Sequence, residues 1–204
     1  MMRRGWMVSM ALIALLFAGC VTPGKRGGDV AQAVYDLEPG GRKPAMVRAQ
    51  PLALEVRAPA WFDGLGIDYR LAYADSARLR EYALARWAGP PAQMIQWRLM
   101  RDLGVSAHGQ VRTACLMRLE LEEFSQVFDS ETQSRGVLRA RVQWLDRQRN
   151  VLDEWGLDVT VPAPTPDVAG GVFALRATVD RLAEQISARE QASLAARRLT
   201  VCQG

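Results

Sequence analysis

The sequence predicts a single domain of the α+β class, with an antiparallel-rich sheet and two main helices on one face of that sheet. Two observations support this prediction. Several stretches of strand length alternate apolar with polar residues. Two other stretches repeat apolar residues at the three- and four-residue spacing of an amphipathic helix. We find no internal repeat and no low-complexity segment, so one folded body is expected.

The first predicted strands lie in the N-terminal half. Residues 35–41 (YDLEPGG) form a short strand-like piece that ends in turn residues. Residues 52–59 (LALEVRAP) and 67–73 (IDYRLAY) alternate apolar and polar side chains, which is the period of a half-buried strand. The sequence ADSA then predicts a hairpin turn before residues 78–87 (RLREYALARW).

The first predicted helix follows the turn residues 89–91 (GPP), because proline lacks the N–H that would be unpaired at a helix start. Apolar residues then repeat every four positions, at Ile95, Leu99 and Leu103. Gly104 fits the C-terminal stop of this helix.

Three further strands are predicted as an antiparallel meander, over residues 116–124 (LMRLELEEF), 136–146 (GVLRARVQWLD) and 151–161 (VLDEWGLDVTV). Residues 124–135 (FSQVFDSETQSR) are predicted to be a loop between the first two of these strands. Loops on rigid scaffolds commonly carry binding function, although a plain connector is equally consistent with this sequence. The candidate partner-contact residues of this loop are Phe124, Phe128, Asp129, Ser134 and Arg135.

The second helix is predicted from about Gly171 to Ala188, with Asp167 as its N-cap or first-turn acid. Its apolar residues are spaced 3-4-3-4 and form a stripe that suits packing on a sheet. They are Val172, Leu175, Val179, Leu182 and Ile186. Residues 190–204 are predicted to form a basic-rich C-terminal tail.

The N-terminus has the layout of an export signal that ends at a lipidated cysteine. Two arginines precede an apolar run over residues 7–17, and the small residues Ala18 and Gly19 stand directly before Cys20. The run is shorter than the ~20 residues that a membrane-spanning helix needs. We expect cleavage after Gly19, a diacylglyceryl group on the Cys20 thiol and an acyl group on its freed amine. The alternatives are a signal peptide without lipid and an N-terminal core helix.

Lipidation of Cys20 implies that the protein acts at a membrane surface outside the cytoplasm. Several acyl chains give stable attachment, because each buried methylene contributes ~0.8 kcal/mol. Val21 follows the cysteine instead of the aspartate typical of inner-membrane retention, which favours the periplasmic leaflet of the outer membrane. The predicted organisation is a signal peptide (1–19), a lipidated N-terminus and tether (20–34), the α+β domain (35–189) and the tail (190–204).

Charge and motifs exclude several classes of function. Residues 1–19 contain two of the 26 basic residues of the chain. Without them, the remaining basic residues exceed the 22 acidic residues by only two. Nucleic-acid binding is therefore not indicated. No catalytic motif is present, so an enzyme is not expected. The single histidine, His108, lies in a predicted loop, and no Cys/His cluster suggests a metal. Glu120, Glu122 and Glu123 are interpreted as a solvated strand face.

Cysteine and tryptophan residues leave two questions open. Cys115 and Cys202 can form a disulfide in an oxidising periplasm, or Cys115 can be buried as an ordinary small apolar residue. The five tryptophans that follow the predicted signal peptide either line an apolar lipid pocket or pack in the core. They are Trp61, Trp87, Trp97, Trp144 and Trp155.

Five segments together resemble the ABC-type transport auxiliary lipoproteins, the family that contains the lipoprotein of the paraquat-inducible transport system. They are YDLEPG (35–40), LALEVRAPAWFDGLGIDYRLAY (52–73), RWAGPPAQMIQWRLMRDL (86–103), LELEEFSQVFDSETQSRGVLRARVQWLD (119–146) and GGVFALRATVDRLAEQI (170–186). The resemblance covers most of residues 35–187. Departures are YDL, where members often carry Tyr-Tyr-Leu, and the longer tail after Glu190.

The resemblance implies an outer-membrane lipoprotein that faces the periplasm and accompanies an MCE-domain protein, an ABC permease and an ATPase. Such systems move lipids between the two membranes, and this chain would dock the assembly, with a homo-oligomer as one arrangement. It implies no cofactor beyond the lipid groups on Cys20. Two alternatives of different class are a lipid-binding carrier with its own apolar cavity and an outer-membrane assembly lipoprotein.

Replacing the lipidated cysteine tests the anchor. Cys20→Ala should leave the protein in the soluble periplasm or as uncleaved precursor, because no thiol remains to receive the diacylglyceryl group. Membrane fractionation and the intact mass measure this outcome. Cys202→Ser removes a different thiol and should stay with the membrane. Normal acylation and membrane fractionation of Cys20→Ala would contradict the prediction.

Overall fold

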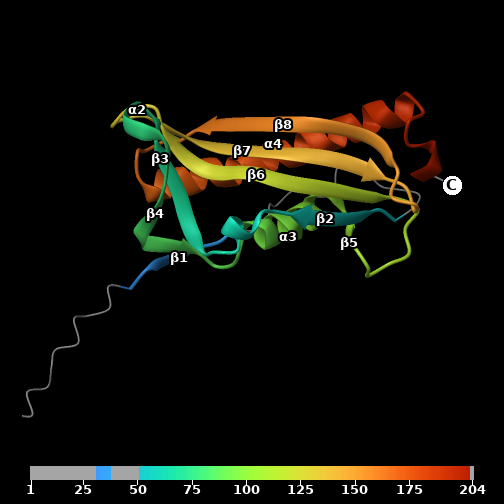
Figure 1. The fold of residues 1–204 in the computed structure, drawn as a ribbon, viewed down its shortest axis with the longest axis horizontal. Coiled ribbons are helices and arrows are strands. Elements are labelled where there is room, and N and C mark those ends of the chain that lie inside the picture. The colour runs from blue at the N-terminus through green and yellow to red at the C-terminus, as the bar shows by residue number, and fades with distance from the viewer. Residues whose placement is uncertain (1–30, 38–50, 203–204) are drawn as a thin grey trace, which may run out of the picture. The chain divides into compact units, whose positions relative to one another are not determined.

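The computed structural model describes residues 31–37 and 51–202 (Figure 1). The elements described below belong to the compact unit Gln32–Gly204. Cys20 and the predicted signal peptide lie outside the described residues. In chain order the elements are β1 (Ala33–Tyr35), β2 (Ala53–Arg57), the 3-10 turn η2 (Ala60–Phe62), β3 (Gly66–Leu71), α2 (Ala72–Asp75), β4 (Ser76–Trp87), α3 (Pro91–Leu103), β5 (Ser106–Ala107), β6 (Leu116–Phe128), β7 (Ser134–Leu145), β8 (Val151–Pro162), α4 (Val168–Ala195) and the 3-10 turn η3 (Thr200–Cys202).

One mixed sheet contains all eight described strands. Its order is β1-β4-β3-β6-β2-β5, and β7 and β8 extend it from the other side of β6. Among the described strand pairs, β1–β4, β2–β5, β2–β6 and β3–β6 are parallel, whereas β3–β4, β6–β7 and β7–β8 are antiparallel. The prediction of antiparallel pairing therefore holds for the meander β6–β8 and the hairpin β3–β4. It is wrong for the four parallel pairs, which join β1 to β4, β2 to β5 and β6, and β3 to β6. Apolar alternation reports that a strand exists, but it carries no information on the direction of the neighbouring strand.

Both main helices cover the same face of the sheet. In Figure 1, α4 runs behind β6, β7 and β8, and α3 lies beside β2. The two helices touch each other and contribute to one hydrophobic core with the inner sheet face. Trp87 and Trp144 are each only 1% exposed in this core, which favours the packing interpretation for these two tryptophans. The α+β class with two main helices is confirmed.

A β-bulge in β6 changes which side chains face the core. Before the bulge, Met117, Leu119 and Leu121 point inward. The register against β7 shifts between Leu121 and Glu123, so one extra residue stands in β6 and the inward positions change parity. Phe124 therefore points into the core after two successive glutamates.

The predicted loop over residues 124–135 is wrong in its extent. β6 continues to Phe128 and β7 begins at Ser134, so the connection shrinks to residues 129–133. Phe124, Phe128 and Ser134 are buried in these strands. The polar residues of this stretch suggested a loop, but β6 needs its full length because β3 pairs with its last residues.

Close backbone approach positions α4 on the sheet. A Cβ atom added at Gly136 in β7 would lie 2.8 Å from the backbone of Ala174 and Leu175, so only glycine fits there. A Cβ at Gly171 would collide with the amide group of Gln126. Asp167 caps the helix as predicted, with its Oδ1 accepting a 2.8 Å hydrogen bond from the Gly170 N–H.

The C-terminal region is part of the folded body, which corrects the prediction of a tail from residue 190. α4 extends past the expected end at Ala188 and runs to Ala195. Leu199 is 1% exposed in the core. The structure joins Cys202 to Cys115 in a disulfide, with 5.3 Å between the two Cα atoms. The chain therefore folds back to the start of β6.

Truncating the apolar stripe of α4 should destabilise the fold. Leu182 is fully buried, so Leu182→Ala is expected to lower the free energy of unfolding by about 2–5 kcal/mol. Leu84 is 59% exposed, and Leu84→Ala should change it by less than about 0.5 kcal/mol. Urea unfolding of the oxidised protein measures both. Equal small effects would mean that α4 does not pack on the sheet through this stripe.

Two carboxylates face each other in the β3–β4 ladder, where Asp68 is the register partner of Glu81. Burial, and then the charge of Glu81, raise the pKa of Asp68 to about 6, although Arg70 opposes this. A carboxyl with a raised folded-state pKa binds its proton more tightly when folded. Ionised Asp68 therefore destabilises the fold at pH 7, and this cost disappears as the pH falls through 6 towards 4.

Asp68→Asn should consequently stabilise the protein at pH 7, by no more than about 1 kcal/mol because solvent screens a half-buried group. Most of the advantage should be lost near pH 4, where Asp68 of the folded wild type carries its proton. Urea midpoints at the two pH values measure this difference. Glu131→Gln, on the exposed β6–β7 turn, is the matched control and should not reproduce it. A variant that is less stable than wild type at pH 7 would refute the argument.

Candidate functional site

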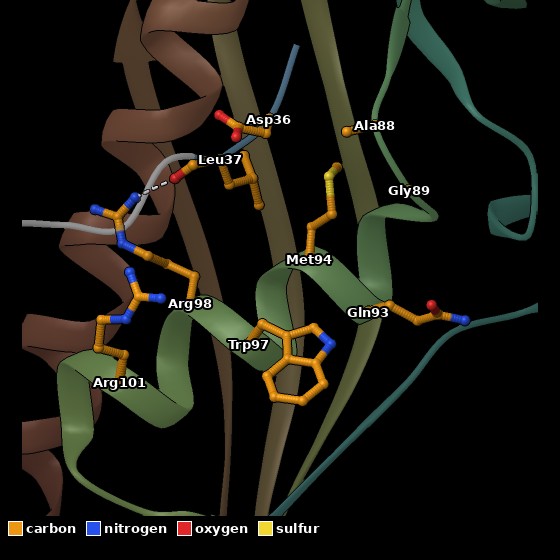
Figure 2. Close-up of a pocket in the computed structure, with 9 residues that line it drawn as sticks. All are labelled: Asp36, Leu37, Ala88, Gly89, Gln93, Met94, Trp97, Arg98 and Arg101. Atoms are coloured by element: carbon orange, nitrogen blue, oxygen red, sulfur yellow. Dashed lines mark hydrogen bonds between the residues drawn. The ribbon is translucent and has the colours of Figure 1, made fainter. Parts of the chain in front are cut away.

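A cavity of about 330 Å³ opens beside α3 where the chain leaves β1 (Figure 2). Two apolar side chains of α3, Met94 and Trp97, lie at it, and the backbone around Leu37 forms its other wall. Its lining residues are Asp36, Leu37, Ala88, Gly89, Gln93, Met94, Trp97, Arg98 and Arg101.

The helical period explains why α3 presents these side chains. Ile95 and Leu99, four residues apart, face the core with no exposed surface. The position between them, Trp97, lies on the outward side of the helix and is 64% exposed. A large exposed aromatic residue on a rigid helix is a candidate contact for a partner.

Arg98 is the charged residue of this cavity, and its contacts give it an internal role. The side chain is buried, and its Nε donates to Asp102 Oδ2 at 2.7 Å within α3. The guanidinium also donates to Asp180 Oδ1 of α4 and to the Leu37 carbonyl, the bond drawn in Figure 2. A buried charge needs such partners, so Arg98 ties both helices to the segment after β1.

A second ionic cluster fixes the far end of α4 against β8. Asp153 is buried, and it accepts hydrogen bonds from Arg189 at 2.9 and 3.1 Å and from the Ser193 hydroxyl. Arg198 approaches the same carboxylate at 3.4 Å. Burial alone would raise the pKa of Asp153, but hydrogen bonds from Arg189 and Ser193 outweigh it and hold that pKa below its usual value. The Arg189 guanidinium also lies 5.2 Å from the Trp155 ring centroid.

Gln126 joins three elements beneath the start of α4, and the sequence analysis did not identify it. Its Oε1 accepts a 2.8 Å hydrogen bond from the Tyr82 hydroxyl of β4. Its Nε2 donates to the Ser134 hydroxyl at 2.8 Å and to the Asp167 carbonyl at 3.1 Å. Burial raises the pKa of Tyr82, so this hydroxyl keeps its proton and remains a donor. Gln126 lies among polar residues in the sequence, so the sequence pattern did not indicate that its side chain is buried.

The predicted partner-contact residues are split by the structure. Ser134 is buried, and its hydroxyl accepts the hydrogen bond from Gln126. Asp129 and Arg135 lie at the β6–β7 turn and bond to each other, with 2.9 Å between Arg135 Nε and Asp129 Oδ2. Phe124 packs in the core against Trp87. Asp129 and Arg135 therefore lie nearer the surface than Phe124, Phe128 and Ser134.

The glutamates of β6 belong to an ionic network on the outer sheet face. Glu123 lies 3.2 Å from Arg70 and 2.8 Å from Arg139, and Glu122 lies 3.7 Å from Arg141. Glu122 is exposed, as predicted for a solvated strand face, whereas Glu120 and Glu123 are half-buried.

No metal site is assembled within residues 31–37 and 51–202. These residues contain no cluster of three His, Cys, Asp or Glu side chains suited to a metal ion. His108 is exposed, and its Nε2 lies 3.2 Å from Arg149 Nη2. In the same part of the chain, no helix has the length and apolar character to cross a membrane.

Comparisons with known proteins agree with the fold. Protein XCC0632 from Xanthomonas campestris, described with family model DUF330, has a structure that is similar at 18% identity and a TM-score of 0.61, over 76% of this chain and 90% of that one. An uncharacterised protein of known structure is similar at 13% identity and a TM-score of 0.63, over 78% of this chain and 98% of that one. These likenesses show the fold alone. No curated protein matches the sequence.

A family model described as the ABC-type transport auxiliary lipoprotein component matches residues 35–187. The match spans β2 through most of α4 and includes Arg98 with its partners Asp102 and Asp180. Of the second ionic cluster it includes Asp153, whereas Arg189, Ser193 and Arg198 lie beyond its end. The chain therefore belongs to the family of ABC-type transport auxiliary lipoprotein components.

Proposed function

We propose that this protein is an outer-membrane lipoprotein that faces the periplasm and serves an MCE-type ABC transport system moving lipids between the two membranes. The observation that carries the proposal is the family match over residues 35–187. An auxiliary component associates with transporter components, and the proposed partner is the MCE-domain protein. Through it the chain would be connected to the permease and the ATPase.

The polar clusters support docking as the mode of action. Arg98 and Asp153 are both buried, and their contacts join elements of the fold to one another. Their charges thereby stabilise a rigid body and are not directed at a substrate. Exposed aromatic residues, Trp61 and Trp97, stand on this body at 70% and 64% exposure. Large exposed aromatic side chains are typical of protein interfaces.

The lipid-carrier alternative has less support. The cavities beside Trp97 and Trp61 measure about 330 and 350 Å³, which is the lower end of the range for drug-sized ligands. The first of them has a buried arginine in its wall, whose charge already pairs with Asp102 and Asp180. A carrier for a two-chain lipid would need a larger apolar interior.

The anchor gives docking its physical advantage. A folded body held by acyl chains at Cys20 and a short tether stays within tens of ångströms of the membrane, so its effective concentration for a periplasm-spanning partner is high. An interface of modest affinity is then sufficient. The proposal includes the outer membrane because Val21 follows the cysteine.

Co-purification tests the proposal. The affinity-tagged full chain, extracted in detergent, should retain the MCE-domain protein encoded by the same organism. Cys20→Ala should lose most of this association in cells, yet the purified variant should bind the purified MCE-domain protein within about 2-fold of wild type, because the anchor contributes only local concentration. Absence of binding by both forms would refute the docking function.

A deletion variant belongs to the same experiment. Removing Glu131 to Gln133 shortens the exposed turn between β6 and β7 and spares both strands. Weaker co-purification with an unchanged unfolding midpoint would support the turn as a contact. Unchanged co-purification would remove the turn, with Asp129 and Arg135, from the interface.

A further inference from the structure

The outer edge of β4 is open along most of the strand. β1 pairs only with residues 85–87 at the end of β4, and β3 pairs with β4 on its other side. Among the described strands, none lies beside residues 76–84 on the outer side. This stretch is accessible, since Arg80 and Tyr82 are half-buried and all its other residues are exposed. An incoming strand can therefore reach its backbone.

Hydrogen bonds at both ends define the unpaired part of this edge. The Arg70 guanidinium donates to the carbonyls of residues 76 and 77 at 3.4 and 3.2 Å. The Ala83 carbonyl accepts a 2.9 Å hydrogen bond from the side-chain amide of Gln32, just before β1. Residues 78–82 lie between these contacts. An edge strand directs every second residue's N–H and C=O groups away from its sheet, so this part offers donors and acceptors to a further strand.

Two arginines of this edge lie on the inner side of the sheet. Arg78 and Arg80 alternate with outward residues and share the face of Tyr82, whose hydroxyl donates to Gln126 beneath α4. The register partner of Arg80 is the uncharged Tyr69. Within the described part of the chain, neither arginine forms an ion pair, and the Arg80 Nε has no hydrogen-bond acceptor.

The acidic residue of the same strand does not compensate these charges. Glu81 lies on the outer face, where its register partner is Asp68. On the inner side, Asp167 is the acid that acts on Tyr82, but its Oδ1 already accepts hydrogen bonds from the Thr165 hydroxyl and the Gly170 N–H. The inner side of the edge therefore carries positive charge that favours an acidic group.

We propose that the open edge of β4 binds an extended acidic segment of a protein partner, which adds a strand beside residues 78–82. The inference rests on the proposed docking function and names the surface that performs it. Five strand residues extend over about 17 Å, so the occupant supplies about five extended residues. Because strand side chains alternate, acidic residues at two-residue spacing lie opposite Arg78 and Arg80, and apolar or basic residues lie beside Leu79 and Glu81.

Three other occupants fit this edge less well. An anionic lipid headgroup matches the arginines, but its phosphate has no N–H groups for the carbonyls of the edge. A second copy that pairs through the same strand would bring arginines against arginines. The chain's own residues before β1 are also unsuited, because in the register of β1 Arg26 would stand opposite Arg78 and two glycines would follow it.

Charge reversal tests the arginines in the full oxidised chain. The double variant Arg78→Glu, Arg80→Glu should raise the Kd for the purified MCE-domain protein by about 10-fold or more, with a larger effect at low salt. Arg112→Glu reverses an exposed arginine between β5 and β6 and should change the Kd by less than about 2-fold. Unfolding midpoints check that the variants are folded. Equal Kd values for wild type and the double variant would contradict the proposal.

Hydrogen exchange distinguishes an added strand from a contact through side chains alone. In the complex of the wild-type chain with the MCE-domain protein, outward amides of residues 78–82 should exchange at least about 10-fold more slowly than in the free chain. Residues 109–113, between β5 and β6, are the reference and should exchange at the same rate in both. Mass spectrometry of the corresponding peptides measures this. Unchanged exchange over residues 78–82 would overturn the added strand.

Cross-linking identifies the occupant independently of these measurements. A photoreactive p-benzoylphenylalanine replaces Ala77, or Arg112 as control, and is activated in membranes before the adducts are mapped by mass spectrometry. Position 77 should yield a peptide of a transport component with acidic residues at two-residue spacing, and position 112 should not. Adducts to lipid alone, adducts to this chain alone, or equal yields at both positions would overturn the site.

The experiments separate this inference from the function on which it rests. If wild type binds the MCE-domain protein with unchanged exchange over residues 78–82, the docking function stands and this edge is not its surface. If wild type binds no transport component and position 77 forms no protein adduct, both fall. If position 77 cross-links to an acidic segment of a different periplasmic protein, the strand site stands and the proposed partner is wrong.

Discussion

The seating of α4 on the inner face of β6 and β7 is the constraint on which the rest of the structure depends. It requires glycine at Gly136 and Gly171, because any side chain there would meet the helix backbone or Gln126. It also requires the buried amide of Gln126, which satisfies the Asp167 carbonyl at the helix start. Once α4 is placed, its stripe closes the core, and α3 packs beside it.

Buried charged residues stabilise the fold in addition to the apolar core. Each of the two buried ionic clusters attaches a segment that lies at the edge of this core. Arg98 holds the segment after β1 to both helices, and Asp153 holds the end of α4 and the chain beyond it to β8. These clusters direct their hydrogen bonds inward. The surfaces that remain for recognition therefore include exposed aromatic residues such as Trp61 and Trp97.

The sequence predicted the elements better than their arrangement. Both main helices, the meander and the Asp167 cap followed from periodicity and local chemistry, which depend on neighbouring residues. The parallel pairing of β2 and β3 with β6 depends on residues far apart in the chain, so no local pattern reports it. The polar run after Phe124 was misassigned because Gln126 and Ser134 are polar residues paired inside the fold.

The disulfide between Cys115 and Cys202 has a consequence for resistance to proteolysis. It joins residues 87 positions apart and encloses β6, β7, β8 and α4 in one covalent ring. A single cleavage anywhere in that ring, for instance at the exposed turn after Phe128, opens the loop but releases no fragment. Both pieces stay linked to each other and to whatever the N-terminus is attached to. A molecule that has been cleaved once can therefore stay in one covalent piece at its site of attachment until a second cleavage occurs.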